Sequence, residues 1–161
     1  MNEKELLRKL GEETIYTAKG HFKSVDIRKS ATKYTILACM ILSLLGVIGV
    51  HEVADKWISA TGVLLTFLLF YWDAEEGKDY RLRHKQVGEQ YLALHKQIRT
   101  CYFLNECSSN RVNELSEQVI QLDQTNKPDI SSIARKSAKN AILKNDETDN
   151  WFTLPQNFQQ Q

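Results

Sequence analysis

Two uncharged apolar stretches, separated by six residues, constrain this chain more than any other feature. Residues 34–50 read YTILACMILSLLGVIGV and residues 57–72 read WISATGVLLTFLLFYW. As helices they would be roughly 24–26 Å long, slightly less than a hydrocarbon core of about 30 Å. A pair of buried helices in a soluble bundle is the alternative, but bundle helices keep a polar stripe and these stretches have none. The pattern predicts two transmembrane helices.

The flanking charges predict how the helices are oriented. Basic residues precede the first stretch and follow the second, whereas the connecting loop HEVADK (51–56) contains one Lys. The positive-inside rule then places both termini in the cytoplasm and the loop outside. We therefore expect an all-α membrane protein. Its parts are an N-terminal amphipathic helix (1–33), a two-helix transmembrane hairpin (34–72), cytoplasmic helices (73–144) and a flexible tail (145–161).

Each stretch carries a stripe of small or hydroxylated residues at helical spacing. The first stripe is Cys39, Ser43, Gly46 and Gly49, and the second is Ser59, Gly62 and Thr66. Such residues let helix backbones approach closely in lipid. They can hold the hairpin together, or one stripe can face other subunits or a water-filled lumen. No Asp, Glu, Lys or Arg lies in either stretch, which argues against a proton relay.

A heptad-like seam follows the second stretch, beyond an expected hinge at Gly77. Its spacings of four and three connect Tyr80, His84, Val87, Tyr91, Leu94 and Ile98. This spacing is typical of a coiled coil, so the seam predicts a homo-oligomer.

The C-terminal part contains a weaker helix and a tail. A helix over 128–144 carries a basic face of Arg135, Lys136, Lys139 and Lys144, which is typical of a solvated surface and could alternatively contact anionic headgroups or nucleic acid. The tail has no periodicity, yet it contains Trp151, Phe152, Leu154 and Phe158. These side chains could pack on the cytoplasmic helices, touch the membrane interface, bind a partner or remain exposed.

Motifs for catalysis and cofactor binding were not found. There is no HExxH, phosphate loop or GxSxG, and the four His are scattered along the chain. The sequence predicts no enzyme activity, no cofactor and no metal site. The 21 basic and 20 acidic residues nearly balance, so direct nucleic-acid binding is not expected. The three Cys form no CxxC pair, which predicts reduced thiols in a cytoplasmic setting.

The chain resembles the SLATT family, the SMODS- and SLOG-associating two-transmembrane effector domains of bacteria. The resemblance rests on TIYTAKGHFKSVDIRKS (14–30), the short-looped hairpin and YRLRHKQVGEQYLALHKQIR (80–99), and it covers roughly residues 5–125. It implies an antiphage effector of abortive infection that perforates the inner membrane. The implied partner is a genomically linked nucleotide-signal synthase, nucleotide sensor or reverse transcriptase. The alternative hypothesis is a non-conducting membrane anchor or scaffold that recruits a soluble partner.

Overall fold

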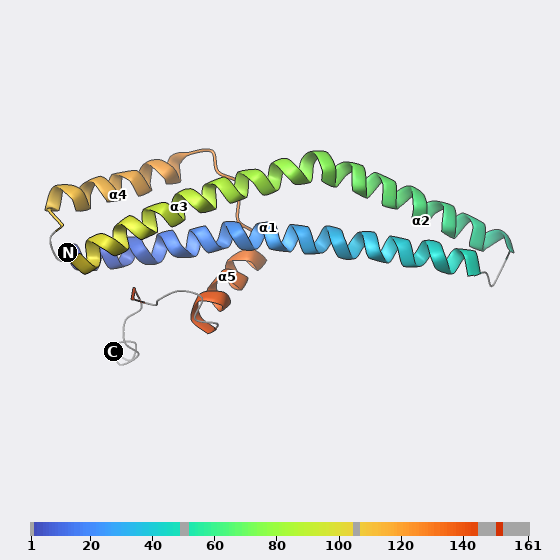
Figure 1. Ribbon diagram of the computed structural model, residues 1–161, viewed down its shortest axis with the longest axis horizontal. Helices are drawn as coiled ribbons and strands as arrows, with labels where there is room; N and C mark the ends of the chain where they lie inside the picture. The colour runs from blue at the N-terminus through green and yellow to red at the C-terminus, as the bar shows by residue number, and fades with distance from the viewer. Residues whose placement is uncertain (1, 49–51, 105–106, 145–150, 153–161) are drawn as a thin grey trace. The chain divides into compact units, whose positions relative to one another are not determined.

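The computed structural model describes residues 2–48, 52–104, 107–144 and 151–152, and the regular secondary structure in these ranges is helical, with no strand. In chain order (Figure 1) the elements are α1 (Glu3–Ile48), α2 (Glu52–Trp72), the π-helical turn η1 (Asp73–Gly77), α3 (Lys78–Leu104), α4 (Ser109–Gln124) and α5 (Ser132–Lys144). The prediction of an all-helical chain is confirmed.

The helices are grouped in two compact units. Unit 1 consists of Met1–Ser24 and Arg83–Gln161, and unit 2 consists of Val25–Leu82. Helices α1 and α3 each contribute residues to both units because α1 has no Pro along its 46 residues and α3 follows η1 directly.

Unit 2 contains the C-terminal part of α1, helix α2 and η1. Large apolar side chains of this unit are exposed, for example Leu44 (62 %), Phe67 (71 %) and Leu68 (56 %). Measured over its described residues, no helix combines the length and the apolar content needed to cross a bilayer. The two-span membrane hairpin stays a prediction.

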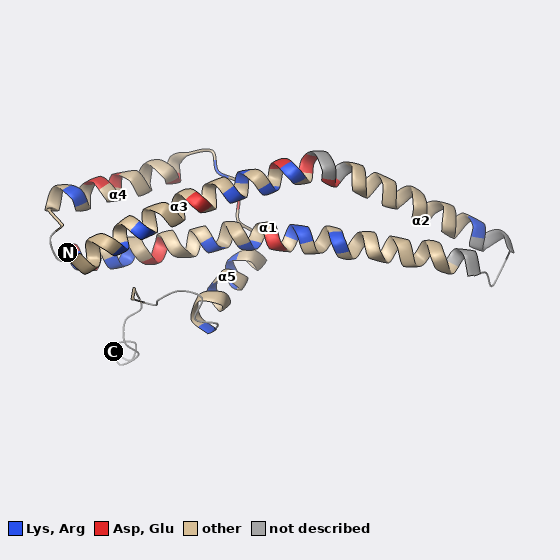
Figure 2. Cartoon of the chain, in the orientation of Figure 1, with Lys and Arg blue, Asp and Glu red and all other residues tan. Residues whose placement is uncertain are grey.

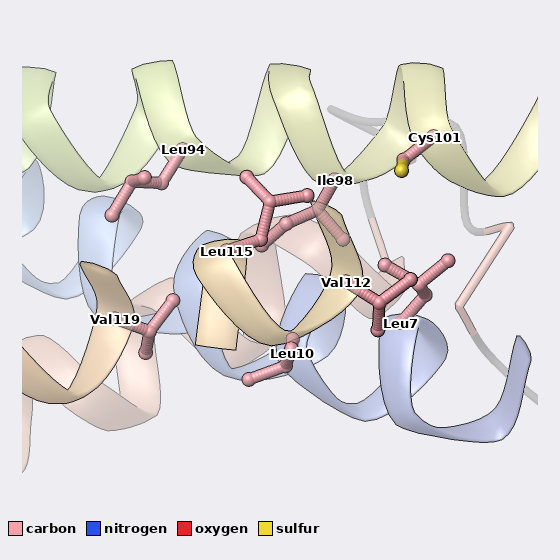
Figure 3. Packing of buried hydrophobic residues seen from close by; sticks show 8 residues of the cluster. All are labelled: Leu7, Leu10, Leu94, Ile98, Cys101, Val112, Leu115 and Val119. Atoms are coloured by element: carbon pink, nitrogen blue, oxygen red, sulfur yellow. The ribbon is translucent and has the colours of Figure 1, made fainter. Parts of the chain in front are cut away.

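The main apolar core of unit 1 lies among three helices (Figure 3). Helix α1 contributes Leu7 and Leu10, α3 contributes Leu94, Ile98 and Cys101, and α4 contributes Val112, Leu115 and Val119. Helix α4 is capped at its start by Ser108, whose side chain accepts a hydrogen bond from the Arg111 N–H at 3.3 Å. Helix α5 packs with a small-residue face of Ala134, Ala138 and Ala141.

Most of the heptad seam of α3 is buried within the single chain, and its role as an oligomerisation surface stays a prediction. His84, Tyr91 and Ile98 are fully buried and Leu94 is 8 % exposed, while Tyr80 and Val87 are half-buried. The apolar side chains of the seam already contact α1 and α4 of their own chain. They leave little surface for a second copy, so the periodicity reports packing inside unit 1.

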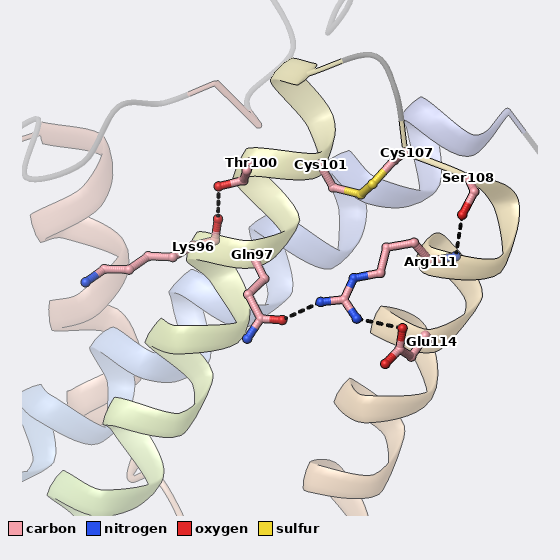
Figure 4. Close-up of a disulfide and its surroundings, with 8 residues drawn as sticks. All are labelled: Lys96, Gln97, Thr100, Cys101, Cys107, Ser108, Arg111 and Glu114. Carbon is pink, nitrogen blue, oxygen red and sulfur yellow. Dashed lines mark hydrogen bonds and ion pairs between the residues drawn. A yellow bond between two sulfur atoms is a disulfide. The ribbon is translucent and has the colours of Figure 1, made fainter.

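A disulfide joins Cys101 near the end of α3 to Cys107 just before α4 (Figure 4). The two Cα atoms lie 5.4 Å apart, within the range that a disulfide requires. The expectation that all three cysteines are reduced is therefore wrong for this pair. A spacing of six residues carries no helical signal, and only the reversal of the chain between α3 and α4 brings the two thiols together.

Truncation of Ile98 tests the burial of the seam within the chain. We expect Ile98→Ala to lower the free energy of unfolding by about 2–5 kcal/mol, because it leaves a cavity in the three-helix core. Lys96→Ala, an exposed position on the same helix, should change it by less than about 0.5 kcal/mol. Chemical denaturation followed by circular dichroism measures both, and equal small effects would contradict the packing described here.

Candidate functional site

The two small-residue stripes meet inside unit 2, where α1 and α2 approach closely at Gly62. A Cβ atom at position 62 would lie 2.4 Å from Ser43 Oγ and 3.2 Å from the carbonyl oxygen of Cys39. The Ser59 hydroxyl donates a hydrogen bond across the two helices to the carbonyl of Ser43 at 3.1 Å. Only glycine fits this contact without displacing α1.

The remaining hydroxyl groups of the stripes bond within their own helices. Ser43 Oγ donates to the Cys39 carbonyl at 2.8 Å, and Thr66 Oγ1 donates to the Gly62 carbonyl at 2.8 Å. Cys39 is buried at 8 % exposure. Gly46 lies within α1, and Gly49 lies outside the described residues. These contacts are those of helix packing within the hairpin.

A polar cluster occupies the turn where α2 passes through η1 into α3. Arg81 forms an ion pair with Asp73 at 2.8 Å, and the Thr32 hydroxyl of α1 donates to the same carboxylate at 3.2 Å. A Cβ atom at Gly77 would collide with Asp73 Oδ1. Glycine at this position leaves room for the Asp73 carboxylate to reach Arg81. The expected hinge at Gly77 is thus part of a specific polar contact.

Unit 1 contains a fully buried histidine pair. His21 of α1 and His84 of α3 place their Nδ1 atoms 2.8 Å apart, so one ring donates a proton and the other accepts it. Burial lowers the pKa of both rings, and that of His21 falls to about 4. The pair is therefore neutral at physiological pH. Sequence analysis missed this pair because its members are 63 residues apart and lie in different helical patterns.

A second polar group continues from the histidine pair. The Tyr91 ring stacks on His21 with 6.2 Å between centroids and an interplanar angle of 18°. Its hydroxyl donates to the Asp123 carboxylate and accepts a hydrogen bond from Lys127 Nζ at 2.7 Å. Burial raises the pKa of Tyr91 to about 12, so the phenol keeps its proton. This network connects α1, α3 and the C-terminal end of α4.

Two tail residues pack against unit 1. Phe152 is fully buried against Ile15 and Ile142, and Arg8 Nη1 donates to its carbonyl oxygen at 2.6 Å. Trp151 lies over Gly11, where a Cβ atom would be 2.3 Å from the indole ring. Packing on the helices of the same chain is one of the alternatives that the sequence leaves open for the tail aromatics, and a helical glycine makes room for the indole. Leu154 and Phe158 lie outside the described residues.

Metal ligation has no support in the described ranges, where no group of three or more His, Cys, Asp or Glu could hold an ion.

A comparison with protein families gives a positive result. The model of the SMODS and SLOG-associating 2TM effector domain 6 matches residues 1–146. The chain belongs to this family. No curated protein and no solved structure matches the chain.

The resemblance expected from the sequence is confirmed, and membership in the SLATT family implies an effector role in a conflict or defence system. The match contains both units' helices and the histidine pair. Trp151 and Phe152 lie beyond the matched residues. Their docking on unit 1 is therefore a feature that the family match does not describe.

The histidine pair makes the stability of this SLATT chain depend on pH. The unfolded chain binds a proton at His21 near pH 6.5, whereas the folded chain does so only near 4. The unfolded state therefore holds more protons between these values, and the free energy of unfolding falls as the pH is lowered from 7 to 4.5. Thermal unfolding of His21→Gln should show a shallower decrease over this range. Equal slopes for the two proteins would contradict a buried neutral pair.

Docking of the tail is tested at Gly11. We expect Gly11→Leu to expel Trp151 into water, which shifts its fluorescence emission to longer wavelength. The measurement requires Trp57→Phe and Trp72→Phe, because the chain contains three tryptophans. Lys9→Leu, at an exposed position of α1, adds the same side chain without touching the indole and should leave the emission unchanged. An unshifted spectrum for Gly11→Leu would contradict the contact.

Proposed function

We propose that this chain is an inner-membrane effector of a bacterial antiphage system. In this proposal the hairpin of residues 34–72 inserts into the bilayer, and unit 1 lies in the cytoplasm. A signal from a genomically linked partner then causes several copies to disrupt or permeabilise the membrane. The partner classes that the family resemblance implies are a nucleotide-signal synthase, a nucleotide sensor and a reverse transcriptase.

The supporting observation is the exposed apolar surface of unit 2. Large side chains such as Leu45, Phe67 and Phe70 are more than half exposed. No charged residue occurs in 34–50 or 57–72, and the described parts of both stretches are free of blue and red in Figure 2. Apolar surface in water costs roughly 25 cal/mol per Å², so an uninterrupted surface of this kind requires lipid or protein to cover it.

The charges beside the hairpin support the proposed orientation. Lys23, Lys29 and Lys33 precede the first stretch, and Lys78 and Arg83 follow the second. An excess of Lys and Arg near both outer ends favours a cytoplasmic position for both termini.

Permeabilisation requires several copies, because one hairpin cannot enclose a lumen. The α3 seam is consumed by packing within unit 1, so the copies would meet elsewhere. The outward apolar surfaces of α1 and α2 in unit 2 remain available, and lateral packing of hairpins through them is the assembly that we propose.

A second candidate is a non-conducting membrane anchor for a soluble partner. It is favoured by the hydrogen bonds of Ser43, Ser59 and Thr66, whose hydroxyl groups all donate within the hairpin. A lumen built from the outward faces would then be lined by apolar side chains.

Membrane potential distinguishes the two candidates. Inducible expression with and without the neighbouring genes is followed with a potential-sensitive dye. The effector predicts depolarisation only after the partner is activated, and the anchor predicts none under any trigger. Gly62→Leu should abolish depolarisation while membrane insertion is kept, because it separates α1 from α2. Gly62→Ala adds only one methyl group at the same contact and should impair depolarisation less than Gly62→Leu does.

A further inference from the structure

Unit 1 contains a cavity of about 440 Å³ between α1, α5 and the segment that joins α4 to α5. Tyr16, Thr17 and His21 line it from α1, and Arg135 and Lys139 line it from α5. The connecting segment lies against α1 at Gly20, where a Cβ atom would be 3.0 Å from Ile130 Cδ1. The cavity is within the size range of pockets for small molecules.

The charged residues that line this cavity are predominantly cationic. Lys127, Arg135 and Lys139 are opposed by one lining carboxylate, that of Asp129. Arg135 and Lys139 are four residues apart on α5, so they lie on one face of this helix. Within the described ranges neither of these two side chains takes part in an ion pair. A pocket with this charge favours an anionic ligand.

Lys127 is held in place by the polar network and keeps donor capacity. Its ammonium donates to Tyr91 Oη at 2.7 Å and to Asp123 Oδ1 at 2.5 Å, which uses two of its three N–H groups. Burial lowers the pKa of Lys127, but the hydrogen bonds that its ammonium donates to Asp123 and Tyr91 raise the pKa by more, and the net shift is upward. The amine is therefore charged and oriented, with one proton left for a ligand oxygen.

The inner wall provides a second, independent observation. His21 lines the cavity and is fully buried, and among the described residues its Nε2 atom has no hydrogen-bond partner. A buried polar atom without a partner is uncommon in folded proteins. The pocket thus combines one oriented cation, Lys127, and two exposed cations of α5 with an unsatisfied polar group at its wall.

We propose that this cavity binds a soluble phosphate ester of nucleotide size. Lys127, Arg135 and Lys139 would contact the phosphate oxygens, for which guanidinium and ammonium groups are suited. Thr17 offers a hydroxyl group, and Tyr16, Pro128 and Ile130 offer an aromatic and apolar wall for the organic part. The site belongs to unit 1 alone and does not depend on the proposed membrane role.

Binding is tested with the full chain in phosphatidylcholine nanodiscs, using pyrophosphate and adenosine monophosphate as probes and calorimetry or thermophoresis as readout. We expect saturable binding of both probes at concentrations of about 1 mM or below. The double variant with Arg135→Gln and Lys139→Gln should raise the dissociation constants of both probes by about tenfold or more. Lys136→Gln combined with Lys144→Gln removes the same charge from exposed positions of α5 outside the cavity. This control variant should bind both probes with dissociation constants within about twofold of those of the unsubstituted chain.

Two outcomes would overturn the proposal. The first is the absence of saturable binding of both probes, or an equal loss in the two double variants, which would reduce the site to the general charge of α5. The second is displacement of the probes when phosphatidylglycerol is included in the nanodisc, which would identify a lipid headgroup as the source of the phosphate. Circular dichroism of each variant confirms that the helices are retained.

Discussion

The close contact between α1 and α2 at Gly62 is the interaction on which unit 2 depends. With no side chain at this position, the backbone of α2 reaches Ser43 and Cys39, and Ser59 can bond across the interface. The small and polar groups are thereby enclosed between the helices, and large apolar side chains such as Phe67 and Leu44 are left on the outside. An exterior of this kind suits lipid, where packing of small residues holds helices together.

Unit 1 also contains helical glycines that allow close contacts. Gly11, Gly20 and Gly88 lie in the middle of helices, where glycine costs about 1 kcal/mol relative to alanine. Each makes room for one side chain, which is Trp151, Ile130 and Phe22 respectively. Close packing then excludes water from the histidine pair and from the hydroxyl of Tyr91. The two histidines hydrogen-bond to each other, and the Tyr91 hydroxyl bonds to Asp123 and Lys127. The cavity beside Lys127 is the exception, because its lining cations exceed its carboxylate.

Periodicity and charge predicted much of the fold. The uncharged stretches and the family resemblance could be recognised in the sequence. The last helix was expected over 128–144, and α5 begins four residues later, at Ser132. The α3 pattern also predicted a buried face, yet it could not say whether the covering surface came from the same chain. Leu94 and Ile98 are covered by residues of α1 and α4. The residues that pack over the seam belong to helices distant in the sequence, and a heptad spacing does not predict which helices these are.

Most contacts of the candidate site could not be predicted from the sequence, for the same reason. His21 and His84, Trp151 and Gly11, and Cys101 and Cys107 meet only after the chain folds back on itself. A scattered histidine or a glycine inside a helix is weak evidence when considered alone. The small-residue stripes were predictable because both lie on regular helices joined by a short loop, so their meeting required only that the hairpin close.

The membrane position of the hairpin is measured most directly by topology reporters. Alkaline phosphatase, which is active only outside the cytoplasm, is inserted at position 51, between α1 and α2, and, in a second fusion, placed after Gln161. A membrane hairpin with both termini inside predicts an active loop fusion and an inactive C-terminal fusion, with the chain retained in membranes after carbonate extraction. An inactive loop fusion on a chain that carbonate releases would contradict the account.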